Sequence, residues 1–217
     1  MLEVRLGNVY GDNMPDKANS VDIKSTRRSY HHGDLRDALV TGGLALLCNR
    51  SADALSLREV ARHAGVSATA VYRHFPDKQA LLYAMCERGA EQLAAVQTIA
   101  VREAGGGVKG FEAAGRAYVH FAQANPGLYR LMMATRPSLA DHCLDANAMG
   151  SAMQLLKKCV AEVLPPSASA HDHRTMALHA WSLVHGISML MLDGLVTPES
   201  DMVEALVSMP MKQLTQP

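Results

Sequence analysis

Two short helical patterns, joined by a single glycine between residues 56 and 75, constrain the fold of this chain more than any other segment. The run Ser56-Leu57-Arg58-Glu59 is a capping box, in which the serine hydroxyl and the glutamate carboxylate can each bind a free backbone N–H at a helix start. Apolar residues then recur at helical spacing up to Gly65, which tolerates the positive φ that ends a helix. Ser67 can cap a second short helix, whose inner side carries Val71 and Phe75. The pattern predicts two short helices that pack at a steep angle.

The outer face of the second helix is small, polar or basic. It carries Ser67, Ala68, Thr69, Tyr72, Arg73 and His74. The major groove of B-DNA admits one α-helix, and hydroxyl and guanidinium groups bind base edges and phosphates there. A plain helical hairpin inside a bundle has no use for so many basic and hydroxyl groups on one short face. We therefore predict a helix-turn-helix that binds double-stranded DNA.

The rest of the chain also shows helical spacing of apolar residues, without the alternation typical of strands, so the predicted fold class is all-α. We expect helices at about 34–48, 57–64, 67–75, 77–103, 111–124, 126–134, 139–164, 171–196 and 199–208. The expected parts are a flexible, basic-ended arm at 1–29, the DNA-binding domain at 30–92 and a second helical domain at 93–217. The glycine-rich stretch Gly105 to Gly110 is expected to be a linker between two layers.

The charges of the chain are unevenly distributed although the 21 basic and 21 acidic residues cancel. Residues 23–88 contain ten Lys and Arg against six Asp and Glu, a net charge of +4, whereas the segments before and after are each net −2. This asymmetry suits a protein whose first part alone meets phosphate. A fluctuation of four charges is nevertheless common, so the charge pattern by itself adds little.

Several features bear on the location of the protein in the cell. Four scattered cysteines without a C-x-x-C pair indicate reduced thiols, and the first 22 residues lack the apolar core of a signal peptide. The most apolar stretch, Ala177 to Leu192, is interrupted by histidines and serines, so no membrane span is expected. We expect a cytoplasmic protein, with Met14 as an alternative start to Met1.

The segment from Ser56 to Leu82 resembles the TetR/AcrR family of bacterial regulators, notably Ser56-Leu57-Arg58-Glu59-Val60-Ala61-Arg62-His63-Ala64-Gly65-Val66-Ser67, Val71-Tyr72-Arg73-His74-Phe75-Pro76-Asp77-Lys78 and Ala80-Leu81-Leu82. The resemblance covers about residues 33 to 90. It implies a homodimer that binds a palindromic operator, a three-helix DNA-binding domain, a long fourth helix, and a C-terminal helical domain that senses a small molecule.

On matching positions, the resemblance implies phosphate contacts from Tyr72, His74 and Lys78. It also implies that the side chains approaching base edges are those of Ser67, Ala68, Thr69 and Arg73, with Arg58 as a further contact. Basic arms can reach the neighbouring backbone or minor groove, which makes Arg27 and Arg28 additional candidates.

The C-terminal half resembles the Trp-His-Gly branch of the same family, through Asn125-Pro126-Gly127-Leu128-Tyr129-Arg130-Leu131-Met132-Met133 and Trp181-Ser182-Leu183-Val184-His185-Gly186. This resemblance implies dimerisation through about 171–196 and 199–208. Methionines adapt to apolar ligands of varied shape. The expected effector pocket is formed by Tyr118, Phe121, Tyr129, Met132, Met133, Met153, Trp181, His185 and Met189, although core packing alone also explains each of them.

The sequence gives less support to a nucleotide site, a metal site or an enzymatic activity. Gly105-Gly106-Gly107-Val108-Lys109-Gly110 matches G-x-G-x-x-G, but a helix rather than a strand precedes it, so no nucleotide site is expected. The ten histidines show no convincing metal-ligand spacing, and no catalytic signature is visible. We expect no cofactor, no metal and no enzymatic activity. The alternatives are an all-α enzyme or small-molecule carrier that uses the Met-rich cavity, and a DNA-binding activator instead of a repressor.

Overall fold

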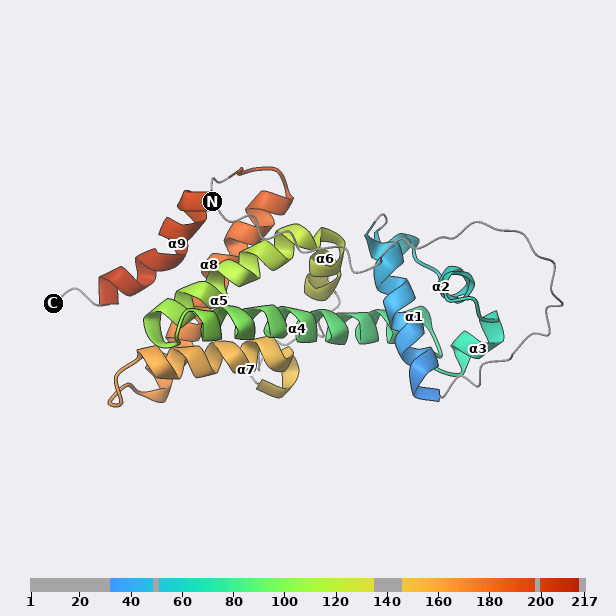
Figure 1. Cartoon of the computed structure of the whole chain (residues 1–217), viewed down its shortest axis with the longest axis horizontal. Helices are drawn as coiled ribbons and strands as arrows, with labels where there is room; N and C mark the ends of the chain where they lie inside the picture. The colour runs from blue at the N-terminus through green and yellow to red at the C-terminus, as the bar shows by residue number, and fades with distance from the viewer. Residues whose placement is uncertain (1–31, 49–50, 135–145, 198–199, 215–217) are drawn as a thin grey trace, which may run out of the picture. The chain divides into compact units, whose positions relative to one another are not determined.

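The computed structural model describes residues 32–48, 51–134, 146–197 and 200–214, and these described residues form one compact unit. Across these described ranges the chain is helical and contains no β-strand, which confirms the predicted all-α fold (Figure 1). The elements are α1 (His32–Leu47), the 3-10 helix η1 (Ala52–Ala54), α2 (Leu57–His63), α3 (Ala68–Tyr72), α4 (Lys78–Glu103), α5 (Gly107–Ala124), α6 (Pro126–Ala134), α7 (Ala146–Val163), α8 (Ala170–Leu192) and α9 (Ser200–Leu214).

Helix α3 depends on its neighbours because its five residues are too few for a helix that is stable alone. Its inward side chain Val71 and the following Phe75 are 0% and 1% exposed, in a cluster with Leu39 of α1 and Val60 of α2. The guanidinium of Arg36 lies over the Phe75 ring, 5.3 Å from its centroid. These contacts fix α3 against α1 and α2.

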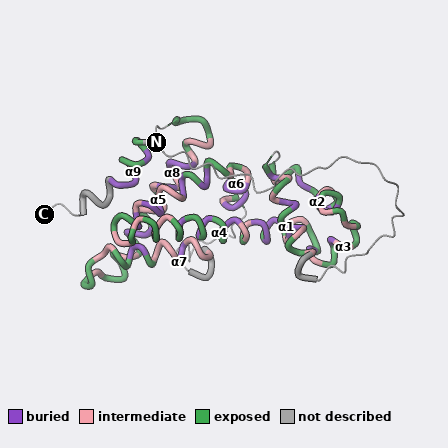
Figure 2. The backbone as a smooth tube through the Cα atoms, viewed as in Figure 1, coloured by how far each residue is buried: buried purple, intermediate pink, exposed green. Residues whose placement is uncertain are grey.

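Helix α4 connects the N-terminal helices to the C-terminal ones (Figure 1). Its 26 residues correspond to about 39 Å at 1.5 Å per residue. It packs against α1, α5, α6 and α7, and α5 in turn packs against α7, α8 and α9. The buried residues of α4 and α5, purple in Figure 2, form the shared core of this part of the molecule.

The glycine-rich stretch is only partly the linker that we expected. Gly105 and Gly106 end α4 with positive φ values of 82° and 73°, and the N–H of Gly106 binds the carbonyl of Val101 at 3.1 Å. Helix α5 then begins at Gly107, four residues before the predicted start. Gly110 is buried inside α5, where a Cβ would lie 3.2 Å from Val101 Cγ1. The glycines therefore make a tight corner between α4 and α5 instead of a loose connection.

The last helices also differ from the predicted bounds. Helix α8 ends at Leu192 rather than at residue 196, because Gly194 at φ 69° allows the N–H of Leu195 to bind the carbonyl of Leu190. Helix α9 continues to Leu214, beyond the predicted end at 208. Helix α7 has a break in helical geometry at Gly150, and the part of its predicted range before residue 146 lies outside the described residues.

Candidate nucleic-acid interface and ligand cavity

The turn between α2 and α3 is fixed by backbone hydrogen bonds. The hydroxyl of Ser56 accepts a bond from the N–H of Glu59 at 3.2 Å at the start of α2. Gly65, at φ 68°, allows the N–H of Val66 to bind the carbonyl of Ala61 at 2.9 Å, which closes the end of this helix. The hydroxyl of Ser67 then accepts a bond from the N–H of Ala70 and starts α3. The predicted capping by both serines and the turn at the glycine are confirmed.

The predicted DNA-contacting side chains of α3 lie on its solvent-facing side. The exposed residues of this side are Ser67, Ala68, Thr69, Tyr72 and Arg73. Tyr72 is 50% exposed, so its ring and hydroxyl are accessible from solvent. Arg58 is exposed at the start of α2, and His74 is half-buried after α3. The face opposite Val71 is therefore available to a macromolecule.

Lys78 is less exposed than the predicted DNA-contacting residues of α3, and its side chain is bonded within the protein. Its side chain is half-buried, and Nζ donates a hydrogen bond to the backbone carbonyl of Asp53 in η1 at 2.7 Å. Asp77 caps the same end of α4 by accepting a bond from the N–H of Ala80 at 2.8 Å. Lys78 thus joins η1 to the start of α4. The two arm residues of the predicted interface, Arg27 and Arg28, lie outside the described residues.

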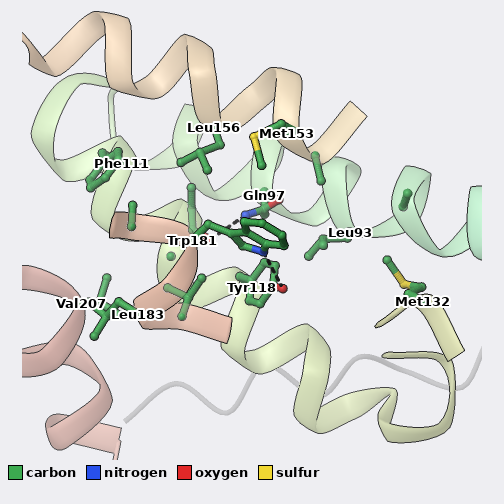
Figure 3. A pocket seen from close by; sticks show the side chains of 16 residues that line it. Leu93, Gln97, Phe111, Tyr118, Met132, Met153, Leu156, Trp181, Leu183 and Val207 are labelled. Carbon is green, nitrogen blue, oxygen red and sulfur yellow. Dashed lines mark hydrogen bonds between the residues drawn. The ribbon is translucent and has the colours of Figure 1, made fainter. Parts of the chain in front are cut away.

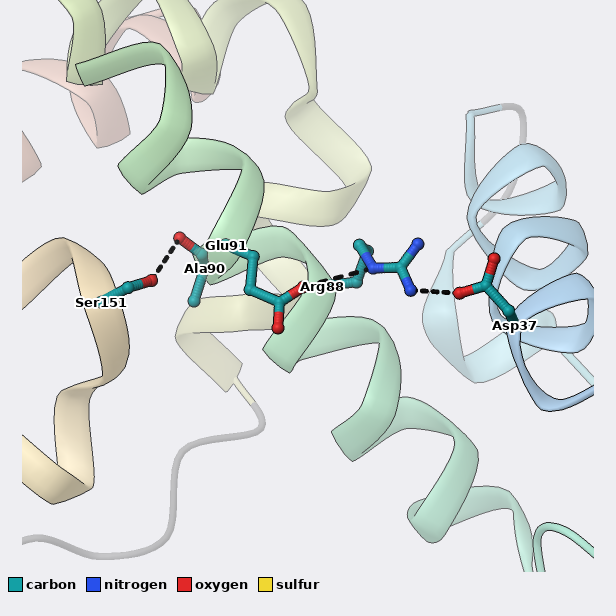
Figure 4. Close-up of polar contacts among 5 residues, drawn as sticks. All are labelled: Asp37, Arg88, Ala90, Glu91 and Ser151. Atoms are coloured by element: carbon teal, nitrogen blue, oxygen red, sulfur yellow. Dashed lines mark hydrogen bonds and ion pairs between the residues drawn. The ribbon is translucent and has the colours of Figure 1, made fainter. Parts of the chain in front are cut away.

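Side-chain contacts link these N-terminal helices to the rest of the chain. Arg88 of α4 donates a hydrogen bond to the carboxylate of Asp37 in α1, and its Nε lies 3.3 Å from Glu91 Oε2 (Figure 4). The bond to Asp37 raises the pKa of the Arg88 guanidinium above its ordinary value. On the other side of α4, the hydroxyl of Ser151 in α7 donates to the carbonyl of Ala90 at 3.3 Å. Helix α4 is therefore bonded both to α1 and to the kinked helix α7.

Helix α6 is wedged between α1 and α4. A Cβ on Gly127 would lie 2.6 Å from the backbone carbonyl oxygen of Leu47, at the end of α1. A Cβ on Gly89 of α4 would lie 2.7 Å from Met132 Sδ and 2.9 Å from Leu128 Cδ1 of α6. Both glycines allow close approach of the helices, so a shift of α6 would be transmitted to α1.

A cavity of about 70 Å³ lies among the C-terminal helices (Figure 3). One water needs about 10–15 Å³ by this measure, so the space is several times larger than one water requires. It is lined by Ala90, Leu93, Gln97, Phe111, Ala114, Gly115, Tyr118, Met132, Ala152, Met153, Leu156, Ala180, Trp181, Leu183, Val184 and Val207. None of these side chains is charged, so the wall is apolar with a few polar atoms.

Four of the nine predicted pocket residues line this cavity: Tyr118, Met132, Met153 and Trp181. Phe121, Met133 and Met189 belong instead to the surrounding core. Tyr129 and His185 lie next to the cavity in a chain of hydrogen bonds. Trp181 Nε1 donates to Tyr118 Oη at 3.4 Å, the hydroxyls of Tyr118 and Tyr129 are 3.1 Å apart, and Tyr129 Oη lies 2.7 Å from His185 Nδ1. This chain positions Trp181 at the cavity wall.

Several lining residues were not predicted, and Gln97 is the most informative of them. It follows Leu81, Met85, Gly89 and Leu93 in the buried row of α4 at steps of four residues. A polar residue at an apolar position of such a row is a visible signal in the sequence. Phe111 and Leu156 have no comparable signal, because ordinary core packing explains apolar residues at these positions equally well.

Two family models match the chain. The model described as bacterial regulatory proteins of the tetR family matches residues 39–85, and the model described as a tetracyclin repressor-like C-terminal domain matches residues 111–214. The first covers the helices of the candidate interface, and the second covers most of the helices that enclose the cavity.

Solved structures with the same fold include a protein of unknown function from Rhodococcus sp. RHA1, which is 34% identical. The match covers 86% of this chain and 96% of that one, with a TM-score of 0.67. A tetR-family transcriptional regulator from Streptomyces coelicolor is 22% identical over 81% of this chain and 78% of its own, with a TM-score of 0.59. RolR, solved in complex with the ligand resorcinol, is 16% identical over 84% of this chain and 88% of its own, with a TM-score of 0.55.

Proposed function

The chain belongs to the TetR family of bacterial regulatory proteins, and we propose that it is a homodimeric repressor that binds a palindromic operator and is released from it by a small-molecule effector. We assign DNA binding to residues 30–92, and effector binding and dimerisation to 93–217. The observation that carries the proposal is the solvent-facing row of hydroxyl, aromatic and guanidinium groups on α3, opposite the buried Val71 and Phe75.

In the proposed complex, α3 lies in the major groove. Thr69 and Arg73 approach base edges, where a hydroxyl can bind several bases and a guanidinium can bind the two acceptors of guanine. Ser67 and Ala68 contact the bases at the start of the helix, and Ala68 suits a thymine methyl. Tyr72, His74 and Lys78 hold phosphates and fix the register, while Arg58, Arg27 and Arg28 add contacts around this centre.

We place the dimer interface on α8 and α9. By length and composition α8 could cross a membrane, contrary to our expectation that its histidines and serines make it too polar, and only 33% of its most apolar 18 residues is buried within the chain. Its outward residues Leu178, Ser182, Gly186 and Leu190 recur every four positions, and a Cβ on Gly186 would meet nothing within 4 Å. On α9, Met202 is 49% exposed. A second copy of the same helices would cover this apolar surface, so no membrane partner is needed for a cytoplasmic regulator.

We assign the effector to the cavity that is enclosed by α4, α5, α6, α7, α8 and α9. RolR, which shares this fold, was solved with resorcinol bound, which supports a small organic effector here as well. Leu93 and Gln97 of α4 line the cavity, and the same helix begins at Lys78 beside α3. A ligand that displaces α4 or α6 would therefore change the separation of the two α3 helices in the dimer. Groove centres on one face of DNA repeat about every 34–36 Å, so a small change of separation breaks the register.

Replacing Tyr72 or Lys78 by alanine tests the phosphate contacts. We expect Tyr72→Ala to weaken binding to the DNA upstream of its own gene by about 30-fold, because one hydrogen bond of about 1 kcal/mol is lost in each half-site. Lys78→Ala should also reduce the salt dependence of binding, by about one unit of slope per lost phosphate contact in each subunit. Gel-shift titrations at several salt concentrations measure both effects.

The matched control is Tyr83→Ala, which removes another exposed tyrosine, at 44% exposure, from the outer face of α4. Its DNA affinity should equal that of the wild type. Unchanged affinity in both Tyr72→Ala and Lys78→Ala would contradict the assigned contacts.

A reporter gene placed under the same upstream DNA tests the sign of regulation. When the regulator gene is deleted, expression of the reporter should rise if the protein is a repressor and fall if it is an activator.

A further inference from the structure

The side-chain amide of Gln97 is only half satisfied. The residue is 8% exposed, and its Nε2 donates a hydrogen bond to the backbone carbonyl of Ala114 in α5 at 3.0 Å. Its Oε1 is buried and has no partner, the one such side-chain nitrogen or oxygen among the described residues. Exchanging the two amide atoms would bring two oxygens together at that distance, so the bond to Ala114 fixes the orientation. Buried amide oxygens are almost always paired, which makes this exception informative.

The unpaired oxygen belongs to a cavity wall that offers it no other donor. Gln97 lies beside Trp181 at the cavity (Figure 3), and the indole N–H of Trp181 is already used by Tyr118. Leu93, Met153 and Leu156 form the neighbouring wall. Oε1 itself is enclosed by these neighbours, so a donor in the cavity reaches it only when a flexible side chain such as that of Met153 moves aside.

From this arrangement we infer that the effector is a compact, uncharged and largely apolar molecule with one hydroxyl or N–H group, which donates a hydrogen bond to Gln97 Oε1. The inference rests on the proposal that this cavity is the effector site. A charged ligand is excluded because no lining side chain carries a counter-charge. The cavity holds about five waters by volume, which suits a ligand about the size of one ring. Met132 and Met153 can adapt to its outline.

Phenol, toluene and benzoate are the probes for this inference. They share one aromatic ring and differ in carrying a donor, no donor or a negative charge. Trp181 is the single tryptophan of the chain and lines the cavity, so its fluorescence reports binding at this site. We expect the wild-type protein to prefer phenol over toluene and to reject benzoate. In Gln97→Leu, of similar size but without the acceptor, the preference for phenol should fall about tenfold, the equivalent of one neutral hydrogen bond.

The control variant is Gln92→Leu, which removes an exposed glutamine from the same helix and should keep the wild-type preference. The thermal midpoint of Gln97→Leu should stay close to that of the wild type, because the substitution removes both the hydrogen bond to Ala114 and a buried unpaired oxygen, and these two effects oppose each other. The same preference in the wild type and in Gln97→Leu, binding of benzoate as tight as that of phenol, or no response of Trp181 to phenol would each overturn the inference.

Titration of all three proteins with the upstream DNA, without probe, separates this inference from the proposed function. If the wild-type protein does not bind this DNA, the proposal that it is a repressor is refuted. The comparison of phenol with toluene would still decide the role of Gln97. Normal DNA binding together with an unchanged ligand preference would refute the role of Gln97 alone.

Discussion

A leucine in place of Gly186 is expected to convert the protein to monomers and to weaken its binding to operator DNA by about 10² to 10⁴-fold, the usual gain from linking two binding events. Within one subunit the position has room for a Cβ, which meets nothing within 4 Å, and glycine is a poor helix former. In the proposed dimer the leucine would add bulk to the face of α8 that contacts the partner helix. Sedimentation velocity and gel-shift titration of the variant measure the two effects.

Ala95→Leu is the matched control, because it adds the same side chain on the exposed face of α4, away from α8 and α9. This variant should remain dimeric and bind DNA normally. A Gly186→Leu protein that keeps the wild-type dimer affinity would show that α8 does not form the interface. Circular dichroism spectra equal to that of the wild type would establish that the subunit itself still folds.

Phe75→Ala should lower the free energy of unfolding by about 3–5 kcal/mol and abolish specific DNA binding. Phe75 is 1% exposed, and with Val71 it anchors a helix of only five residues. The cavity left by the ring would remove the support of α3, so its outward residues would lose their fixed geometry. Chemical denaturation followed by circular dichroism measures the loss, and gel-shift titration measures the effect on binding.

Tyr83→Ala serves again as the control, since truncation of this exposed ring should change the free energy of unfolding by no more than about 0.5 kcal/mol. A Phe75→Ala protein with wild-type stability would contradict the role of this side chain in holding α3. Retained sequence-specific binding in a destabilised Phe75→Ala protein would show that α3 does not need this anchor.

The sequence is most informative where structure depends on residues close together in the chain. The caps at Ser56 and Ser67 and the turn at Gly65 each involve partners within five residues, so the α2–α3 unit is predictable from local pattern. The solvent-facing side of α3 follows from the same periodicity, since Val71 and Phe75 identify the buried side.

The cavity is less predictable because its wall comes from six helices that are distant in sequence. Residue type and family resemblance suggest Phe121 and Met133, yet tertiary packing leaves both outside the lining. The corner at Gly105 and Gly106 was predicted only as a linker, because composition does not distinguish a loose connection from two close-packed helices. Gln97 could have been found from the sequence as a polar residue in the apolar row of α4.

Selection of bound sites from random double-stranded DNA, with the wild-type protein and with Arg73→Ala in parallel, tests most directly whether α3 reads the bases. We expect the wild type to enrich a two-fold symmetric sequence. Arg73→Ala should enrich the same sequence with relaxed preference at one symmetry-related position in each half, because a guanidinium bound to guanine contributes about 1–3 kcal/mol of discrimination. Equally strong base preference at every position in both proteins, or no enrichment by the wild type, would contradict base recognition by α3.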